Sequence, residues 1–298
     1  MATSPSAPLT GAASDARYRA AAAAAAAQAR AGVDVRELTG LPALRSAARL
    51  FADVWNTVPD RPPLNSDLMR ALAHAGNYVV GAFEGEELLG ASVGFLGLRD
   101  RPTLHSHISG VRAGAQGRSI GFALKLHQRD WAVRRGIESV TWTFDPLVRR
   151  NAHFNLVKLG ARATEYLTDF YGDMTDGINA GQHSDRLHLT WPLLAPHVVE
   201  RLDGVPSRRP AEPGAAAGAE PRLAQGADGG PESHPTGAEA QLVWIPPDIE
   251  AVRREDPARA TAWRLALRTA LTGALAEGYA IRTCTRSGHY LLTRRNPS

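Results

Sequence analysis

The 298-residue sequence contains a single cysteine, Cys284. One cysteine cannot form an intrachain disulfide, and it cannot supply a zinc site that needs several thiolates. Such sparing use of cysteine is typical of a reducing compartment, so we expect a cytoplasmic protein. Hydrophobic residues make up 44% of the chain, which is enough for a packed core.

Long apolar runs are missing as well. No stretch approaches the ~18 uninterrupted apolar residues that a membrane-spanning helix needs. The alanine run from Ala20 to Ala27 is too short and too weakly apolar for that role. The N-terminus has no basic segment followed by an apolar core, so it does not read as a signal peptide. We therefore expect no membrane partner.

The formal net charge of +4 is not concentrated anywhere. Basic residues are interleaved with acidic ones, and no basic stripe or known docking motif accompanies them. The basic balance alone suggests a nucleic-acid-associated protein, but this pattern does not support it. We expect no nucleic-acid partner.

Composition divides the chain into four parts. Residues 1–32 form an alanine-rich leader, whose alanine run favours helix but offers no apolar face worth burying, and we expect it to be disordered and peripheral. Residues 33–203 form the main domain. Residues 204–240 are rich in Pro, Gly, Ala and Glu and predict a disordered linker. Residues 241–298 predict a C-terminal αβ extension.

Hydrophobic periodicity predicts an α/β fold with a mixed sheet. The helix expected after residue 119 carries one apolar stripe, which leaves Lys125 and Arg129 off that stripe. The elements expected in the main domain are strands at 33–40, 77–83, 88–98, 103–111, 137–144, 164–171 and 186–191, and helices at 41–55, 120–135 and 149–160. A second short helix is expected to carry Leu68 and Leu72 and to stop at Gly76. In the extension, ordered structure is expected to return at 241–247, followed by a helix at 257–278 and a hairpin at 279–294.

A basic glycine loop, "VRAGAQGRSIGFALK", joins the strand at 103–111 to the following helix. Free backbone N–H groups and the helix dipole favour an anion at such a helix N-terminus. Arg112 and Arg118 would add charge-assisted hydrogen bonds. The alternative is an ordinary strand-to-helix turn that happens to be basic.

The order of elements and the residues of this loop resemble the GNAT acyltransferases. That family has a Gln/Arg-x-x-Gly-x-Gly/Ala motif after its fourth strand, and here Gln116 fills the first position and Gly121 the last. Ser119 stands where the middle glycine is usual. A second register, from Arg118 through Gly121 to Ala123, also matches but lies deeper in the helix, so we prefer the first.

A second landmark of the family is a helix of the form Asn…Tyr-x-Lys-x-Gly-Phe. Asn151, Lys158 and Gly160 match it, whereas Leu156 replaces the tyrosine that often protonates the departing thiolate, and Ala161 replaces the phenylalanine. The wider string resembles a poorly characterised GNAT subgroup with an appended C-terminal segment. The resemblance covers about residues 33–192 as the acyltransferase domain.

This resemblance implies acetyl-CoA or another acyl-CoA as co-substrate. It implies that the backbone between Ser109 and Val111 lies beside the thioester, and that Asn151 and Asn155 approach the pantetheine arm, although Asn151 could instead be a helix N-cap. The pyrophosphate would be cradled by Gln116, Gly117, Arg118, Ser119, Ile120 and Gly121.

The general base is open at this point. Many family members use a glutamate on the fourth strand, but here that strand offers His105 and His107, which titrate near pH ~6.5. Both could equally be polar strand residues. Asp145 is an alternative carboxylate, although capping of the following turn is its more ordinary role. The two histidines lack a convincing third ligand, so we expect no metal.

We therefore expect a GNAT-fold, coenzyme-A-dependent N-acyltransferase that acts on a small amine, such as an amino acid or related metabolite. Acetyl is the default acyl group, with succinyl or another acyl as alternatives. The rival is a catalytically degenerate GNAT module that binds coenzyme A for a regulatory or structural role. The sequence leaves open whether the protein is a homodimer.

Overall fold

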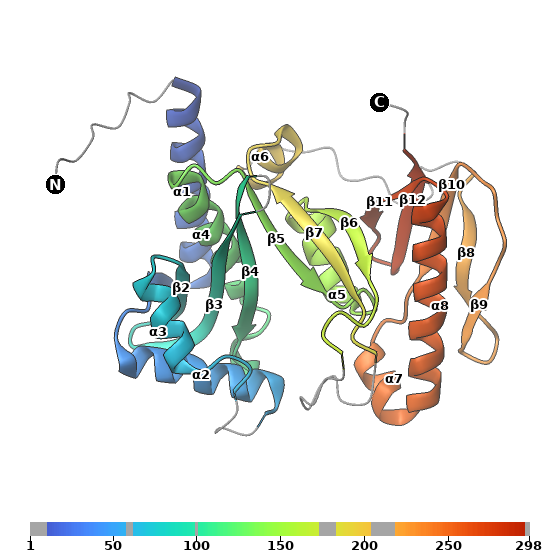
Figure 1. Cartoon of the computed structure of the whole chain (residues 1–298), viewed down its shortest axis with the longest axis horizontal. Coiled ribbons are helices and arrows are strands. Elements are labelled where there is room, and N and C mark those ends of the chain that lie inside the picture. Colours follow the sequence, from blue (N-terminus) through green and yellow to red (C-terminus); the bar gives the residue numbers. More distant parts are fainter. Residues whose placement is uncertain (1–10, 58–61, 99–100, 173–182, 204–217, 296–298) are drawn as a thin grey trace. The chain divides into compact units, whose positions relative to one another are not determined.

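The computed structural model describes residues 11–57, 62–98, 101–172, 183–203 and 218–295. The chain divides into two compact units. Unit 1 consists of Met1–Val140 and Leu193–Val205, and unit 2 of Thr141–Pro192 and Pro206–Ser298. Each unit combines helices with strands, which confirms the predicted α/β class (Figure 1).

Unit 1 contains four antiparallel strands that are neighbours in chain order. Strands β2 and β3 form the predicted hairpin, with Gly85 at the turn in a left-handed conformation (φ 57°) that favours glycine. The strands are β1 (Asp34–Glu37), β2 (Tyr78–Glu84), β3 (Glu87–Leu98) and β4 (Pro102–Val111).

Helices α2 (Leu41–Trp55) and α3 (Ser66–His74) supply apolar side chains to the core of this sheet. Helix α3 begins at a capped end, since the Asn65 side chain accepts a hydrogen bond from the Leu68 N–H at 2.8 Å. Helical spacing places the buried residues of α2 on one face. The core includes Leu44, Phe51, Met69, Val79, Val93 and Ile108.

The N-terminal leader differs from the prediction. Residues 11–31 form helix α1 (Gly11–Ala31), which packs against α4 (Ile120–Arg134) (Figure 1). The expectation of disorder over 1–32 is therefore wrong for this helix, while residues 1–10 lie outside the described residues. The alanines that recur on one face of α1 are small enough to let the two helices approach closely, and four of them are buried: Ala20, Ala24, Ala27 and Ala31.

A second difference concerns two polar residues of α4. Lys125 and Arg129, which lie off the predicted apolar stripe of α4, are both buried. A helix covered by both a sheet and another helix has no fully solvated face, so its polar side chains need partners inside the protein. Arg129 donates to the Leu193 carbonyl at 3.1 Å and to Asp203 at 2.8 Å, beyond helix α6 (Pro196–Leu202).

In unit 2, strand β7 (Arg186–Pro192) lies between β5 (Ser139–Phe144) and β6 (Arg162–Leu167). The helical segment between β5 and β6 begins as α5 (Arg149–Ala152) and continues as a π-helix, η2 (His153–Lys158). The Leu159 N–H donates to the Phe154 carbonyl, five residues earlier, which is the π-helical pattern. Gly160, with a φ of 73°, ends the segment as predicted.

The C-terminal part of unit 2 is a second sheet with the strand order β11-β12-β10-β8-β9. Two of its strands, β8 and β9, fall within the predicted linker, so the expectation of disorder over 204–240 is wrong for 220–233. Residues 204–217 lie outside the described residues. The elements are β8 (Glu220–Gln225), β9 (Pro231–Ser233), β10 (Ala240–Trp244), α7 (Ile249–Glu255), α8 (Pro257–Ala276), β11 (Tyr279–Cys284) and β12 (His289–Arg294).

Strand β8 forms although its composition is polar, because it pairs with neighbouring strands. It pairs in parallel with β10 and antiparallel with β9, and Leu223 is its one buried residue. Backbone hydrogen bonds to a sheet that is already formed can order a polar segment that could not build a core of its own.

The part of the chain that the structure describes contains no helix that is both long and apolar enough to cross a bilayer.

The packing of α1 can be tested with two neighbouring alanines. Ala24→Asp places a charge in the buried contact with α4, so we expect the free energy of unfolding to fall by about 2–3 kcal/mol. Ala25→Asp, on the exposed side of the same helix, should cost about 0.5 kcal/mol or less. Urea denaturation measures both, and equal losses would contradict the packed position of α1.

Candidate functional site

The glycine loop lies wholly in unit 1, between β4 and α4. A short 3₁₀ turn (Ala113–Ala115) follows β4, and the chain then reaches Gly117 with a φ of 84°. Ser119 comes directly before α4 and has a φ of 65°, a left-handed conformation that is uncommon for residues other than glycine. The backbone here takes the form that glycine favours, although the chain has serine at this position.

The N-terminus of α4 presents backbone N–H groups and the Ser119 hydroxyl. The Ser119 side chain makes no capping hydrogen bond, and its carbonyl accepts from the N–H groups of Phe122 and Ala123. The first N–H groups of a helix have no acceptor within the helix. Those of Ile120 and Gly121 therefore lie at the positive end of the helix dipole, beside the Ser119 hydroxyl.

The loop also has room beside its backbone. A Cβ added at Gly114 or Gly117 would meet no atom within 4 Å, and one added at Gly121 would meet only Val111, at 4.0 Å. The alternative motif register needs Ala123, which is fully buried in α4 and cannot face a ligand. The geometry therefore favours the register from Gln116 to Gly121.

Both arginines of the loop are already paired with glutamates of the β2–β3 hairpin. Arg118 forms an ion pair with Glu84 at 2.6 Å, and Arg112 forms one with Glu87 at 3.1 Å. Arg118 also donates to the carbonyl of Ala31, the last residue of α1, at 3.4 Å. These contacts hold the arginines at the rim of the loop, where a bound anion would have to compete with the glutamates.

Strand β4 carries the two candidate histidines. Val93 and Gly94 of β3 pair with Ile108 and Ser106, so His107 is the extra residue of a β-bulge. A bulge disrupts the ladder locally and re-aims the side chain it carries, and bulges are common next to active sites. His107 thus lies at a local irregularity of β4.

The rings of His105 and His107 both contact Phe95 of β3, with centroid distances of 5.0 and 5.7 Å. The two imidazoles are 6.3 Å apart. Partial desolvation lowers the pKa of His107 below its ordinary value. His107 is therefore neutral at physiological pH, the form in which an imidazole accepts a proton.

Ser109 and Val111 follow on the same strand. The hydroxyl groups of Ser109 and the buried Ser92 are 2.7 Å apart, which links β4 to β3 through side chains. Val111 is the last residue of β4, and the next residue, Arg112, donates its N–H to the Leu89 carbonyl at 2.9 Å. The end of β4 is thus fixed to β3 as far as the start of the loop.

Lys125 is a buried polar residue of unit 1 that was not predicted as part of the site. Its ammonium lies inside unit 1, where it donates to the Ser106 hydroxyl at 2.9 Å and to the Gln128 side chain at 3.1 Å. Burial lowers its pKa to about 7. Nothing in the sequence indicated this burial, because Lys125 lies off the apolar stripe of its helix and its partner Ser106 comes from β4.

Asp145 in unit 2 is held by other groups. It accepts two hydrogen bonds from Arg264, at 2.7 and 2.6 Å, and one from the Leu147 N–H at 2.9 Å. Burial by itself would raise the pKa of Asp145, but Arg264 outweighs that effect and keeps it below the ordinary value. The hydrogen bond from the Leu147 N–H is the expected capping of the turn after β5. Because Arg264 stabilises the ionised carboxylate, Asp145 is a poor proton acceptor.

The remaining candidates also lie in unit 2. Asn151 is exposed in α5 and is not its N-cap, since Val148 holds that position. Asn155 is buried in the π-helix, one turn further along. Leu156, which takes the place of the family's tyrosine, is buried too and has no group that could donate a proton.

Within the described residues, no group of three or more His, Cys, Asp and Glu side chains is arranged to hold a metal ion.

No protein-family model matches the sequence, and no curated protein matches it. The chain is similar to several solved acetyltransferases. A GNAT acetyltransferase from Streptococcus pneumoniae is 14% identical over 53% of this chain and 98% of its own, with a TM-score of 0.44. The ribosomal-protein-S18-alanine N-acetyltransferase from Escherichia coli is 12% identical over 54% and 94%, with a TM-score of 0.43.

An N-acetyltransferase from Staphylococcus aureus is 18% identical over 54% of this chain and 98% of its own, with a TM-score of 0.43. In each case the similarity covers about half of this chain.

Proposed function

We propose that the protein is a coenzyme-A-dependent N-acyltransferase that transfers an acyl group to a small amine. The observation that carries the proposal is the loop from Gln116 to Gly121. It matches the family motif in sequence, it has open space beside its glycines, and it adopts a left-handed conformation at Ser119, where the family has glycine.

The loop fits a pyrophosphate. The N–H groups of Ile120 and Gly121 would hold its oxygens at the helix N-terminus, and the Ser119 hydroxyl would add a further donor. Gln116 and Gly117 would line the approach, and Arg118 would contribute charge at the rim. Acyl-CoA, when bound, supplies an activated acyl group; acetyl is the default, with succinyl or another acyl as alternatives.

Acyl transfer from a thioester to an amine needs three things of the protein. The amine must lose a proton, the thioester oxygen must meet a hydrogen-bond donor, and the reacting atoms must be held together. By the family resemblance, a backbone N–H between Ser109 and Val111 is the donor, and Asn151 and Asn155 position the pantetheine arm.

We assign the proton to His107, directly or through water. The neutral imidazole takes a proton from the amine as the C–N bond forms and the C–S bond breaks, and the departing thiolate is then protonated from solvent. His105 shares the Phe95 contact and is the second candidate. Asp145 is the least suitable of the three, because Arg264 already occupies both of its oxygens.

The rival is a module that binds coenzyme A without catalysis. The buried Leu156 in place of tyrosine and the absence of a glutamate from β4 favour it. Both proposals require coenzyme A to bind at the glycine loop, and only the first requires His107 to accept a proton. One experiment tests the loop and another tests His107.

Gly121→Asp tests the loop. The new carboxylate would repel the phosphates, and we expect calorimetry to show the affinity for acetyl-CoA falling at least tenfold, by about 1.4 kcal/mol. Gly121→Ala is the matched control, since its Cβ would meet only Val111 at an ordinary contact distance. Unchanged affinity in a folded Gly121→Asp protein would remove the loop from the binding site.

His107→Ala tests the proton transfer. We expect kcat/KM to fall by about 10²–10⁴ with little change in acetyl-CoA affinity. His107→Gln should be nearly as poor, and His105→Ala, in the same aromatic cluster, should retain more activity. The parent should show an ascending pH–rate limb with a midpoint below ~6.5, because the pKa of His107 is lowered.

The result that contradicts this assignment is a His107→Ala enzyme with the parental rate and pH profile. If no thiol is released with any amine although acetyl-CoA binds, the non-catalytic rival is the better account.

A further inference from the structure

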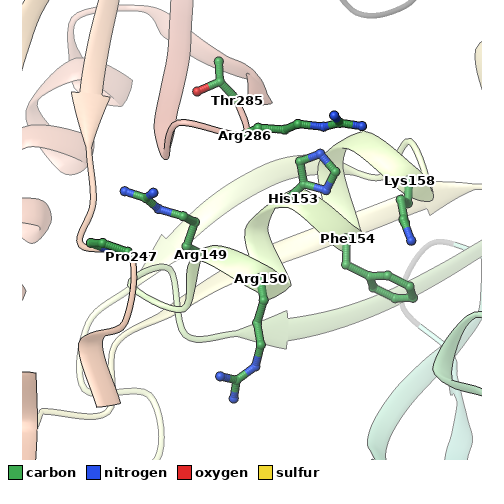
Figure 2. Close-up of a pocket in the computed structure, with 8 residues that line it drawn as sticks. All are labelled: Arg149, Arg150, His153, Phe154, Lys158, Pro247, Thr285 and Arg286. Carbon is green, nitrogen blue, oxygen red and sulfur yellow. The ribbon is translucent and has the colours of Figure 1, made fainter. Parts of the chain in front are cut away.

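Unit 2 contains a pocket of about 380 Å³. One wall comes from α5 and the π-helix, and the other from the C-terminal sheet region, through the loop after β10 and the β11–β12 turn (Figure 2). Its volume lies in the range of small-molecule sites. The lining residues are Arg149, Arg150, His153, Phe154, Lys158, Pro247, Thr285 and Arg286.

The lining is strongly cationic. Arg149, Arg150, Lys158 and Arg286 contribute four positive charges, and no carboxylate is among the lining residues. Like charges around one cavity repel each other, so an arrangement of this kind favours an anion at its centre. The pocket is therefore suited to a ligand with more than one negative charge.

The four cations are not equivalent. Arg150 is fixed by two hydrogen bonds to Glu250, at 2.7 and 2.9 Å. Arg149 donates to the Ile245 carbonyl and lies over the ring of Trp244, with Cζ 5.4 Å from its centroid. These two arginines form a fixed wall of the pocket.

Lys158 and Arg286 are the exposed pair. Within the described parts of the chain, neither forms an ion pair or a hydrogen bond through its side chain. Both charges are thus available to a ligand, and they come from opposite walls of the pocket. A guanidinium and an ammonium that are not already paired are the groups that bind phosphate oxygens in proteins.

The rest of the lining is less polar. Phe154 and Pro247 offer apolar surface beside the cations (Figure 2). The Thr285 hydroxyl is already engaged with Ser287, at 2.9 Å, and with the His289 N–H, at 3.0 Å. Apolar surface therefore lies next to the cations at two places, with Pro247 near Arg149 and Phe154 near Lys158 (Figure 2). This combination suits a phosphate attached to a small organic body.

We propose that this pocket binds a small organic phosphate, held by Lys158 and Arg286 between the π-helix and the C-terminal sheet. The inference does not depend on acyl transfer, since the pocket lies within unit 2 and the glycine loop within unit 1. It gives the C-terminal extension a role, because Arg286 and Pro247 belong to it.

The test uses inorganic pyrophosphate as the probe and the full chain with Gly121→Asp as the background, so that the glycine loop is not available to the anion. Calorimetry should detect binding in this background. Lys158→Glu and Arg286→Glu should each weaken it by about tenfold or more, because each removes a charge-assisted contact and adds a like charge. Arg254→Glu, an exposed arginine of α7 outside the pocket, makes the same charge change and should leave binding unchanged.

Three results would overturn the proposal: no pyrophosphate binding in the Gly121→Asp background, unchanged binding in both pocket variants, or an equal loss in Arg254→Glu. The variants lie at exposed positions, and their circular dichroism spectra verify folding. Acetyl-CoA binding by the otherwise unmodified chain is measured separately, so failure here is distinguishable from failure of the acyltransferase proposal.

Discussion

Two arginines on one helix fasten the C-terminal sheet to the rest of unit 2. Arg264 and Arg268 lie one turn apart on α8, and they form paired hydrogen bonds to Asp145 and Asp185 respectively. Asp185 is fully buried, and Arg264 and Asp145 are nearly so. Buried charges of this kind are costly unless they are paired, so the segment after β5 and helix α8 depend on each other.

In the Asp145–Arg264 pair, each partner shifts the pKa of the other in the direction that favours its charged form. Burial opposes the charge on Arg264, but Asp145 outweighs that effect and raises the pKa of the guanidinium. Asp185 also accepts a hydrogen bond from the Tyr166 hydroxyl at 2.7 Å, and the Tyr290 hydroxyl donates to the Pro146 carbonyl at 2.7 Å. The extension is therefore integrated into unit 2 through polar contacts. The cationic pocket depends on this attachment, because Pro247, Thr285 and Arg286 of the extension form one of its walls.

Much of the fold could be predicted from the sequence, because local chemistry decides where most elements begin and end. Three glycines take left-handed conformations just past helical segments, at the positions where the sequence predicts the helices to end: Gly76, Gly136 and Gly160. The β2–β3 hairpin and the strand–loop–helix unit that holds the candidate site also follow from periodicity and turn residues.

What the sequence could not give depends on contacts between distant segments. Helix α1 packs on α4, about 100 residues away in the sequence, and Lys125 of α4 is buried beside Ser106 of β4. Strand β8 becomes ordered by pairing with β10. The pocket joins Lys158 to Arg286, and neither residue suggests the other by its spacing. Composition and periodicity describe one segment at a time, so they could not predict contacts between segments that are distant in the sequence.

The central claim is that the Asp145–Arg264 pair fastens the extension, and a double-mutant cycle tests it most directly. Asp145→Asn, Arg264→Leu and the double variant are compared by the free energy of unfolding in urea. Each single change should cost about 3–5 kcal/mol, because it removes the paired hydrogen bonds of a buried charge. Asp145 keeps the longer ion pair with Arg253, at 3.6 Å, when Arg264 is replaced. The double variant should cost less than the sum by at least about 2 kcal/mol. Additive losses, or single losses below about 1 kcal/mol, would contradict the account.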